Sequence, residues 1–344
     1  MIPFILPDKP DMALYCSLVD KSIEQNHYTN FGINHNKLKE VLSVKAGTNK
    51  LVLACNATVI LDGLHDILSR KCDVACLPSF TFPATNQGCR SLKTYGYTVD
   101  GGINIGRSVW DISSATHYTN YAVTVNPFGT TNKPCGRPNT NYWVVDNAAG
   151  LLTQVQDWFE AGADAVVYSL HATKILSACE GGIVFFNNDK LYEEYNEYIN
   201  FGFKTLGDGS RVTSPFGSNH KMSELNAAWC LMNLETLDAK LNARSKIADK
   251  YKDICENLGI PYIYSLQSFW ILGKESASKI QKFSYDFGVD VRPYYQELQI
   301  GNRCKTTNLF TSKGVCLPTR STLSDEDVCQ MVFLLGSFRD KNLV

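Results

Sequence analysis

Lys174 lies between an apolar run and a glycine turn, because it ends the string Ser-Leu-His-Ala-Thr-Lys at 169–174 and precedes Glu180-Gly181-Gly182. A lysine held beside a buried strand loses its proton more easily than a solvated lysine. Its neutral amine can then attack an aldehyde and form a Schiff base, the linkage by which enzymes hold pyridoxal phosphate. Most lysines are solvated surface charges, so Lys174 needs support from other residues.

Asp146 closes the string Tyr-Trp-Val-Val-Asp at 142–146. A carboxylate at the carboxyl end of a parallel strand can face a bound ring, and opposite a pyridine nitrogen it would keep that nitrogen protonated. The alternative is that Asp146 caps a loop or forms a buried ion pair. The small residues Ala148 and Ala149 would let a flat ring approach closely. Phe82 could stack on the ring's other face, or it could simply be a core residue.

A possible phosphate site follows the apolar run that ends at Cys55. Asn56-Ala57-Thr58 precedes an amphipathic stretch, 59–68, so the amides of this tripeptide would lie at a helix N-terminus. Free N–H groups and the helix dipole bind phosphate at such ends. The alternative is that Asn56 only caps the helix.

Short apolar runs that alternate with helical stretches between about residues 47 and 235 predict βα units. Each run is bounded by polar or turn residues, as is typical of strands covered on both faces. We therefore expect an α/β fold with a mostly parallel sheet, helices on both faces, and its chemistry at the carboxyl ends of the strands. The expected strands are Leu51–Cys55, Val74–Pro78, Tyr121–Val125, Tyr142–Asp146, Ala165–Ser169 and Gly182–Phe186.

The second half of the chain predicts more helix and a smaller α+β domain. We expect a large domain over 1–235, with residues 1–30 able to pack on a small domain over 236–344. Helical patterns cover 189–198, 222–257 and 276–287 and begin again at Asp325, and short strand patterns cover 262–264 and 269–272.

Composition narrows the class of partner. The chain has 344 residues, 33 of them basic and 34 acidic, with no basic stripe of the kind that binds nucleic acid or an anionic membrane. It has no signal-peptide pattern at its start and no apolar run long enough to span a bilayer. Twelve cysteines are scattered, without the paired spacing of a zinc site. We expect a cytoplasmic protein that acts on a small molecule, without a metal.

Four strings, in order along the chain, resemble motifs of the DegT/DnrJ/StrS family of sugar aminotransferases. They are LPSFTFPAT at 77–85, VVDNAA at 144–149, SLHATKILSACEGG at 169–182 and GSNHKMSELNAA at 217–228. These proteins are pyridoxal-phosphate enzymes of the aspartate aminotransferase fold, fold type I, and the resemblance extends from about Asn30 to Pro318. Within the family, the strings are most similar to those of enzymes that aminate dTDP-keto-6-deoxyhexoses, such as viosamine synthases.

The resemblance implies roles for the matching residues. Lys174 would form the Schiff base and move protons, and Asp146 would pair with the pyridine nitrogen. Asn219 would reach the phosphate of the other subunit, which implies a homodimer with shared active sites. The remaining cofactor contacts would be Phe82 and Ala148, on the two ring faces, and Ala57, Thr58 and Ser169, at the phosphate.

The segment Gly-Val-Asp-Val-Arg-Pro-Tyr-Tyr at 288–295 resembles the family segment that enters the substrate pocket. Arg292 could pair with a nucleotide diphosphate or a glutamate carboxylate, since a guanidinium fork suits both, or it could form a surface salt bridge. We also expect His171 and Tyr294 to contact substrate.

Two departures from the family pattern are visible. Many relatives carry Gln or His where this chain has Ala149, so a contact near the cofactor's ring hydroxyl is missing or comes from elsewhere. The stretch between Tyr95 and Tyr121 is also shorter than usual.

The resemblance implies a transaminase that moves an amino group from L-glutamate, through pyridoxamine phosphate, to a nucleotide-linked keto-6-deoxyhexose. The keto group is expected at position 4 rather than 3, and the product would serve aminosugar and surface-glycan synthesis. Two alternatives stay open. One is the family's dehydratase branch, which has histidine in place of the Schiff-base lysine, although Lys174 is present here. The other is a non-catalytic relative that binds cofactor or nucleotide sugar as a sensor or partner.

Overall fold

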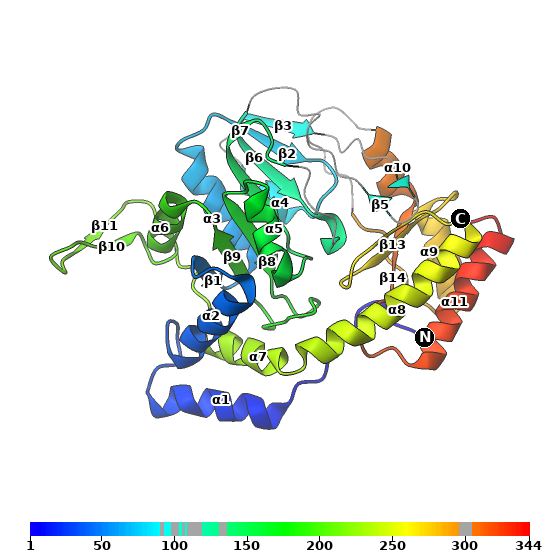
Figure 1. Cartoon of the computed structure of the whole chain (residues 1–344), viewed down its shortest axis with the longest axis horizontal. Helices are drawn as coiled ribbons and strands as arrows, with labels where there is room; N and C mark the ends of the chain where they lie inside the picture. The colour runs from blue at the N-terminus through cyan, green and yellow to red at the C-terminus, as the bar shows by residue number, and fades with distance from the viewer. Residues whose placement is uncertain (90–92, 98–102, 105–106, 109–118, 131–135, 296–304) are drawn as a thin grey trace.

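A computed structural model describes residues 1–89, 93–97, 103–104, 107–108, 119–130, 136–295 and 305–344. It contains a seven-stranded sheet, here called the central sheet, and a three-stranded sheet, here called the C-terminal sheet (Figure 1). Strand order in the central sheet is β1-β9-β8-β7-β6-β2-β3. These strands are β1 (Leu51–Ala54), β2 (Val74–Pro78), β3 (Lys93–Tyr97), β6 (Thr119–Val125), β7 (Thr140–Asp146), β8 (Ala165–Ser169) and β9 (Gly182–Phe186).

The expected mostly parallel sheet is confirmed. Strands β3, β2, β6, β7 and β8 pair in parallel, whereas β9 runs antiparallel to both β8 and β1. All six expected strands are present, and β6 and β7 each begin two residues earlier than expected. β1 ends at Ala54, and the N–H of Cys55 donates instead to the carbonyl of His220, which brings a distant segment to the carboxyl end of this strand.

Helices cover both faces of the central sheet because both faces of its strands are apolar. One face packs on α3 (Ala57–Ser69) and α6 (Asp189–Tyr198). The other face packs on α2 (Ile33–Ala46), α5 (Val155–Glu160) and α7 (Glu224–Leu234). The carboxyl edge of the sheet is left for the loops and short elements α4 (Ala84–Gln87), η1 (Pro127–Gly129) and η2 (Leu152–Gln154).

The expected helix or helix pair after Met222 is two helices, α7 and α8 (Leu237–Leu258). α8 runs from the central body to the C-terminal sheet (Figure 1). That sheet has the order β12-β13-β14 and a separate hydrophobic core with α8, α9 and α11. The division of the chain at residue 235 stays a prediction. The elements here are β12 (Tyr262–Tyr264), β13 (Phe269–Leu272), α9 (Ala277–Asp286), α10 (Lys305–Lys313), β14 (Gly314–Leu317) and α11 (Asp325–Asp340).

The first thirty residues divide between the two sheets. Ile2 forms a parallel bridge with Val289, and Asp8 pairs with Lys240 of α8 at 3.0 Å, so the first residues join the C-terminal part. The helix α1 (Met12–Glu24) instead packs beside α7, where the ring of Tyr15 lies 5.2 Å from that of Trp229. The segment before α1 therefore passes from the C-terminal part to the central body.

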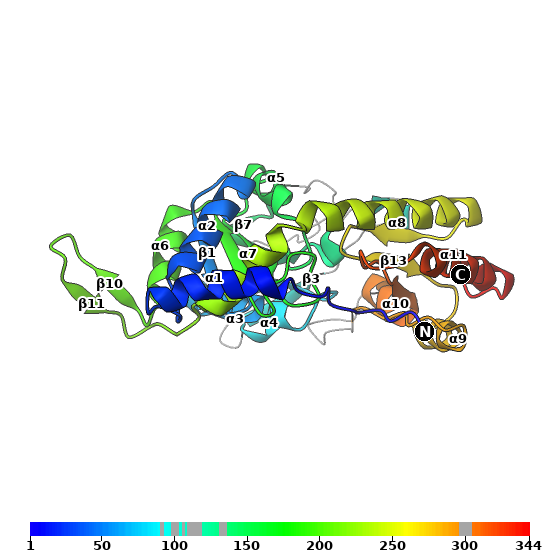
Figure 2. The same cartoon turned by 90° about the horizontal axis from the view of Figure 1, so that it is seen from below.

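A hairpin of β10 (Phe203–Thr205) and β11 (Arg211–Thr213) projects from the central body (Figure 2). A second pair, β4 (Ile103–Asn104) and β5 (Arg107–Ser108), lies in the stretch between Tyr95 and Tyr121, most of which is outside the described residues. Within the described part of the chain, no helix is long and apolar enough to cross a membrane.

Candidate active site

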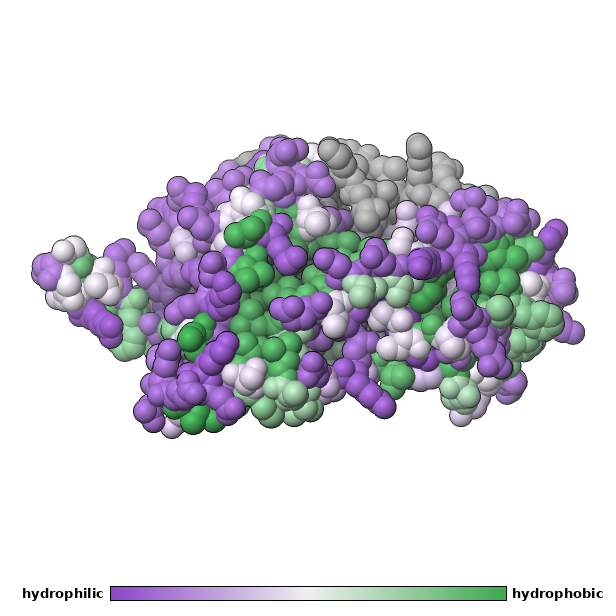
Figure 3. Space-filling model, turned by 60° about the horizontal axis from the view of Figure 1, so that its bottom comes forward, coloured by the Kyte–Doolittle hydropathy of each residue, from purple (hydrophilic) through white to green (hydrophobic). Residues whose placement is uncertain are grey.

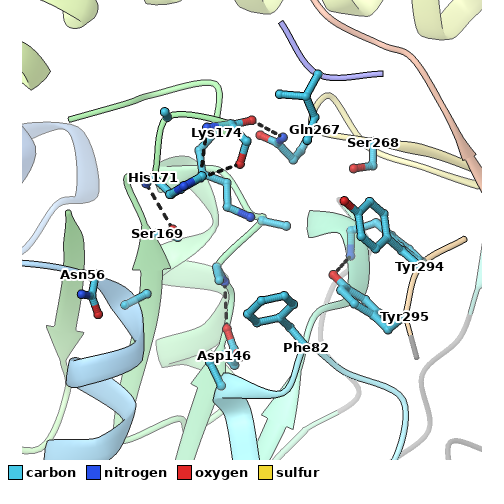
Figure 4. Close-up of a pocket in the computed structure, with 18 of the residues that line it drawn as sticks. Asn56, Phe82, Asp146, Ser169, His171, Lys174, Gln267, Ser268, Tyr294 and Tyr295 are labelled. Carbon is cyan, nitrogen blue, oxygen red and sulfur yellow. Dashed lines mark hydrogen bonds between the residues drawn. The ribbon is translucent and has the colours of Figure 1, made fainter. Parts of the chain in front are cut away.

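A cavity of about 690 Å³ opens at the carboxyl ends of the central strands, between them and the C-terminal sheet. In Figure 4, Lys174 reaches into it from above, Asp146 and Phe82 lie below, and Tyr294 and Tyr295 stand at one side. The structure therefore brings most of the expected site residues together. Those that line this cavity are Ala57, Thr58, Phe82, Asp146, Ala148, Ser169, His171, Lys174 and Tyr294.

Lys174 lies on an irregular loop between β8 and β9. The loop is closed by a hydrogen bond from the N–H of Leu170 to the carbonyl of Gly181, 2.8 Å, and the N–H of Lys174 donates to the carbonyl of His171, 2.8 Å. Burial lowers the pKa of the Lys174 amine, and the carboxylate of Asp146 only partly opposes this shift. A lysine in this state gives up its proton, and becomes a nucleophile, more readily than a surface lysine.

Asp146 ends β7 and is buried, so its charge is costly. Its Oδ2 accepts a hydrogen bond from the Thr85 hydroxyl at 2.6 Å, and its Oδ1 accepts one from the N–H of Ala148 at 3.1 Å. Burial raises the pKa of Asp146, while these two bonds and the nearby Lys174 pull it back down. A buried carboxylate with a raised pKa gains stability when a cation is placed against it.

Thr85 ends the string LPSFTFPAT, but no role was predicted for it, and the structure shows that it belongs to a buried polar chain. Its hydroxyl lies 2.6 Å from that of Thr81, and its carbonyl lies 3.0 Å from Nε2 of His65. Burial lowers the pKa of His65 to about 4, so its ring is neutral and Nε2–H donates to Thr85. A threonine in a short helix gives no sequence signal of this role, because the contact with Asp146 joins residues 61 positions apart.

The helix α3 begins at the cavity with Ala57 and Thr58 in its first turn. The side chain of Asn56 accepts a hydrogen bond from the N–H of Val59, 2.9 Å, so Asn56 caps the helix, and the phosphate role of the neighbouring residues stays a prediction. A Cβ placed on Gly182 would lie 2.6 Å from the nitrogen of Ala57, and only glycine lets the start of β9 approach the helix so closely. The free amides at this helix start can receive a phosphate.

The cavity fits pyridoxal phosphate on the chemistry of its walls. It offers an amine of lowered pKa, a buried carboxylate and a helix N-terminus. Phe82 is 56 % exposed although it is aromatic and borders the cavity, as suits a side chain that covers a flat ring. Ala148 and Ala149 leave room on the side of Asp146, and Ala149 brings no polar side chain.

Two expected residues do not line the cavity of this subunit. Asn219 is exposed and forms a backbone bridge with Asn200, near the base of the β10–β11 hairpin. Arg292 is exposed and bonds the carboxylate of Asp290 at 2.9 Å, the salt-bridge alternative. The roles of both residues in catalysis or binding stay predictions.

The C-terminal part contributes cavity residues that sequence reasoning did not identify. Arg244 of α8 and Arg320 after β14 are both buried, unusual for arginine, and both line the cavity. Their burial depends on contacts between distant segments, so no local pattern marks them. The other such residues are Gln267, Ser268 and Thr319. Tyr295, at the end of the string 288–295, also lines the cavity, as does the N-terminal run Phe4, Ile5, Leu6, Pro7 and Asp8.

Comparison with known proteins agrees with this geometry. The profile of the DegT/DnrJ/EryC1/StrS aminotransferase family matches residues 139–268, which include Asp146 and Lys174. A dTDP-4-amino-4,6-dideoxy-D-glucose transaminase of Shigella dysenteriae is 27 % identical and aligns over 93 % of this chain and 94 % of its own length.

Solved structures show the same fold. DesI, solved in the presence of its TDP-sugar product, has a TM-score of 0.79 at 23 % identity and covers 97 % of this chain and 91 % of its own. PseC of Helicobacter pylori, an aminotransferase of pseudoaminic acid biosynthesis, has a TM-score of 0.78 at 17 % identity, with 98 % of each chain covered. The expected fold is confirmed, and so is the expected similarity to the DegT/DnrJ/EryC1/StrS aminotransferases, whose family model matches residues 139–268.

Proposed function

We propose that this protein is a cytoplasmic, homodimeric aminotransferase that uses pyridoxal phosphate to move an amino group from L-glutamate to a nucleotide-linked 4-keto-6-deoxyhexose. The observation that carries the proposal is that Lys174 and Asp146 face one cavity whose wall also includes the start of α3. An amine, a carboxylate and an anion-binding helix end are the groups that this cofactor requires.

Different residues around the cavity would contact the phosphate, the ring and the aldehyde carbon of the cofactor. Ala57 and Thr58, with Ser169, would bind its phosphate at the start of α3, and Lys174 would hold it covalently. Phe82 and Ala148 would cover its two faces. Bound pyridoxal phosphate supplies an aldehyde carbon for amine exchange and a ring that withdraws electrons from the reacting carbon.

Asp146 and Lys174 would control protons. Asp146 would keep the ring nitrogen protonated, because a cation against the buried carboxylate offsets the cost of its burial. The amine of Lys174, once released from the cofactor, would move a proton between the reacting carbon of the substrate and the aldehyde carbon of the cofactor, in one direction with glutamate and in the other with the keto sugar. Its lowered pKa suits this exchange, since a general base works best with a pKa near the operating pH.

Substrate anions would meet the two buried arginines. Burial lowers the pKa of Arg244 only to about 10, so its guanidinium stays charged at neutral pH. Arg320 donates through Nε to the carbonyl of Pro3, 3.3 Å, and through Nη1 to Thr322 Oγ1, 2.8 Å, which fixes its fork at the cavity wall. A fixed guanidinium suits a carboxylate or a diphosphate.

The choice of sugar rests on the names of relatives. Two curated transaminases named for dTDP-4-amino-4,6-dideoxy-D-glucose align with more than nine-tenths of this chain, and GDP-perosamine synthases align less completely. These names support an amine added at position 4 and leave dTDP ahead of GDP as the nucleotide.

The proposed homodimer would complete the site. Asn219 does not line the cavity of its own chain and lies close to the projecting hairpin, so any contact that it makes with a cofactor phosphate would be with that of another subunit. Apolar side chains are exposed on and beside this hairpin, among them Phe201, Phe203 and Phe216. Others are exposed on α1 and α7, as Met12, Ile23 and Leu225. Figure 3 shows a face of the molecule on which hydrophobic residues gather among polar ones. Apolar surface of this extent favours association.

The proposal is tested with the purified protein loaded with cofactor. Borohydride should attach the cofactor to Lys174, as located by peptide mass, and Lys174→Ala should abolish turnover while still binding cofactor loosely. Lys50, on the protein surface, provides the control variant Lys50→Ala, which should keep both properties. Attachment to another lysine would refute the site.

Substrates are tested in two steps. L-Glutamate alone should bleach the absorbance of lysine-bound cofactor and release one 2-oxoglutarate per site, and a keto sugar should restore the absorbance. A panel of dTDP-, UDP- and GDP-linked 4-keto and 3-keto sugars then identifies the acceptor. A protein that binds the cofactor but does not respond to glutamate would instead be a non-catalytic relative.

A further inference from the structure

Gln267 of the C-terminal part bonds the backbone on both sides of Lys174. Its Oε1 accepts a hydrogen bond from the N–H of Ile175, and its Nε2 donates to the carbonyl of Thr173, each at 3.0 Å. One side-chain amide thus pairs with the residue before and the residue after the lysine, as a neighbouring strand would.

The turn that carries Gln267 is itself firmly held. It joins β12 to β13, and the buried Ser265 Oγ accepts from the N–H groups of Gln267 and Ser268, each at 3.0 Å. The Ser265 hydroxyl donates to the carbonyl of Phe128, which follows β6 at the edge of the central sheet. The turn therefore bridges the two sheets at the cavity.

Arg244 supports the same turn from the other side. Its Nη1 donates to the carbonyls of Leu266, 3.1 Å, and Gln267, 3.3 Å, and the Thr319 hydroxyl donates to the Gln267 carbonyl at 3.2 Å. Because the backbone of Gln267 is hydrogen-bonded at both its N–H and its carbonyl, the position from which its side chain extends is fixed.

We propose that Gln267 is a positioning residue that fixes the Lys174 loop from the C-terminal part and so sets where the Lys174 amine lies in the cavity. The inference rests on the proposed function, in which that amine carries the chemistry. A reacting group displaced by about 1 Å can lose on the order of a hundredfold in rate, so a clamp on its backbone matters for catalysis.

Glutamine suits this position because the loop presents one donor and one acceptor. An amide satisfies both, a carboxylate can only accept, and a thioether satisfies neither well. The clamp also joins the position of the C-terminal part to that of the lysine, since Gln267 lies in a turn of the C-terminal sheet and Lys174 in a loop of the central sheet. Contact between the two parts therefore adds to the bonds within the Lys174 loop, such as that from the N–H of Ala172 to the carbonyl of Cys179 at 2.7 Å.

Two variants separate shape from hydrogen bonding. Gln267→Met keeps the length of the side chain and removes both bonds, and Gln267→Glu keeps the acceptor and places a charge against the Thr173 carbonyl. Gln330→Met is the matched control, because Gln330 Nε2 bonds the carbonyl of Phe287 at 2.9 Å, away from the cavity.

The first measurement needs no cofactor. In the apoprotein, hydrogen exchange at the amide of Ile175, followed in a peptide over 170–182, should be roughly tenfold faster in Gln267→Met, since local opening exposes an amide that has lost its acceptor. Gln330→Met should leave this peptide unchanged. Unchanged exchange in Gln267→Met would overturn the clamp whatever the enzyme does.

The second measurement is kinetic. In Gln267→Met, kcat should fall roughly ten- to a hundredfold with a smaller change in KM, and the pH at which lysine-bound cofactor changes absorbance should shift. Gln330→Met should change neither. A folded Gln267→Met protein with wild-type kcat and an unshifted absorbance would refute a positioning role.

The pH dependence gives a signature that a merely structural role lacks. In Gln267→Glu, the introduced carboxyl group again carries one donor and one acceptor once it is protonated, so the activity of this variant relative to wild type should recover as the pH falls toward the pKa of that group. The titratable neighbours at the cavity, Lys174, His171, Glu180 and Arg244, are unchanged in Gln267→Met, which should show no such recovery. Equal pH profiles for the two variants would contradict the clamp.

These outcomes are distinct from failure of the proposed function. If borohydride labels no lysine but exchange at Ile175 still depends on Gln267, the clamp stands and the aminotransferase proposal falls. If borohydride labels Lys174 and the protein turns over glutamate equally well without Gln267, the aminotransferase proposal stands and the clamp falls.

Discussion

The hydroxyl of Thr85 donates a 2.6 Å hydrogen bond to Oδ2 of Asp146, and both side chains are buried. The bond links the short helix after β2 to the carboxyl end of β7. Hydrogen bonds to a charged acceptor are worth roughly 1.5 to 3 kcal/mol when buried, so Thr85 is a main reason that Asp146 can ionise in an apolar place.

Thr85→Val should raise the pKa of Asp146 further, because the variant keeps the burial and loses the bond that favours the charged form. At a given pH the carboxylate is then ionised in a smaller fraction of the protein. We expect the acid limb of the pH–rate profile to move to higher pH and turnover to fall roughly tenfold. Thr85→Ser restores the hydroxyl and should behave like wild type. An acid limb that does not move in Thr85→Val would contradict the role of this bond.

Asp146→Asn should lower turnover roughly ten- to a hundredfold, since it removes the charge that would hold the ring nitrogen protonated and leaves the shape unchanged. The rate with saturating glutamate and keto sugar measures this loss. A variant with the wild-type rate would remove Asp146 from the mechanism.

The same substitution should have the opposite effect on stability of the apoprotein. The pKa of Asp146 is raised in the folded state above its ordinary value of 3.8. The protonated side chain therefore adds to the free energy of unfolding in full below pH 3.8, and this contribution is lost as pH rises through the folded pKa. At about pH 8 wild type then bears the cost of a buried charge that Asp146→Asn avoids. Thermal unfolding should show the variant at least as stable at about pH 8, with the advantage shrinking toward about pH 4. A clear loss of stability at the higher pH would contradict this account.

The fold was predictable because its signals are local. Runs such as Leu51–Ala54 and Gly182–Phe186 are apolar throughout and bounded by polar residues, which indicates strands buried on both faces. Asp146 and Lys174 were found for the same reason, since each follows such a run. The antiparallel direction of β9 was not predictable, because an apolar run has no direction.

The contacts that support the site were not predictable from local pattern. Thr85, Gln267 and Arg320 are ordinary residues in their own segments and acquire their roles only where distant segments meet. Arg292 shows the converse. Its position in a family-like string predicted a contact with substrate, whereas in this structure its guanidinium forms a salt bridge with Asp290, two residues earlier.

Arg320→Met should raise KM for an anionic substrate roughly ten- to a hundredfold and change kcat less, because it removes a fixed charge from the cavity wall. Arg292→Met should change KM by no more than a few-fold if its exposed bond to Asp290 is its whole role, since such pairs contribute little. Separate titrations of glutamate and keto sugar show which anion Arg320 binds. A larger effect from Arg292 would return the substrate role to that residue.

Mixing two inactive variants tests whether the active site is shared between subunits. Lys174→Ala removes the amine in its own subunit, and Asn219→Ala would remove a phosphate contact from the partner's site. In a mixed dimer, one site then carries both defects and the other carries none. After exchange of equal amounts, half of the dimers are mixed and half of their sites are intact, so activity should recover to about one quarter of wild type.

Subunit exchange is verified independently, with a differently tagged copy of each variant and native mass spectrometry. The control mixes Lys174→Ala with Asp146→Asn, both on the cavity of their own subunit, and should recover no more than the residual activity of the second variant. If the mixture of Lys174→Ala and Asn219→Ala stays inactive after verified exchange, then Asn219 does not act across the interface. In that case the phosphate would have to be held by residues of one subunit, with the start of α3 as its main contact.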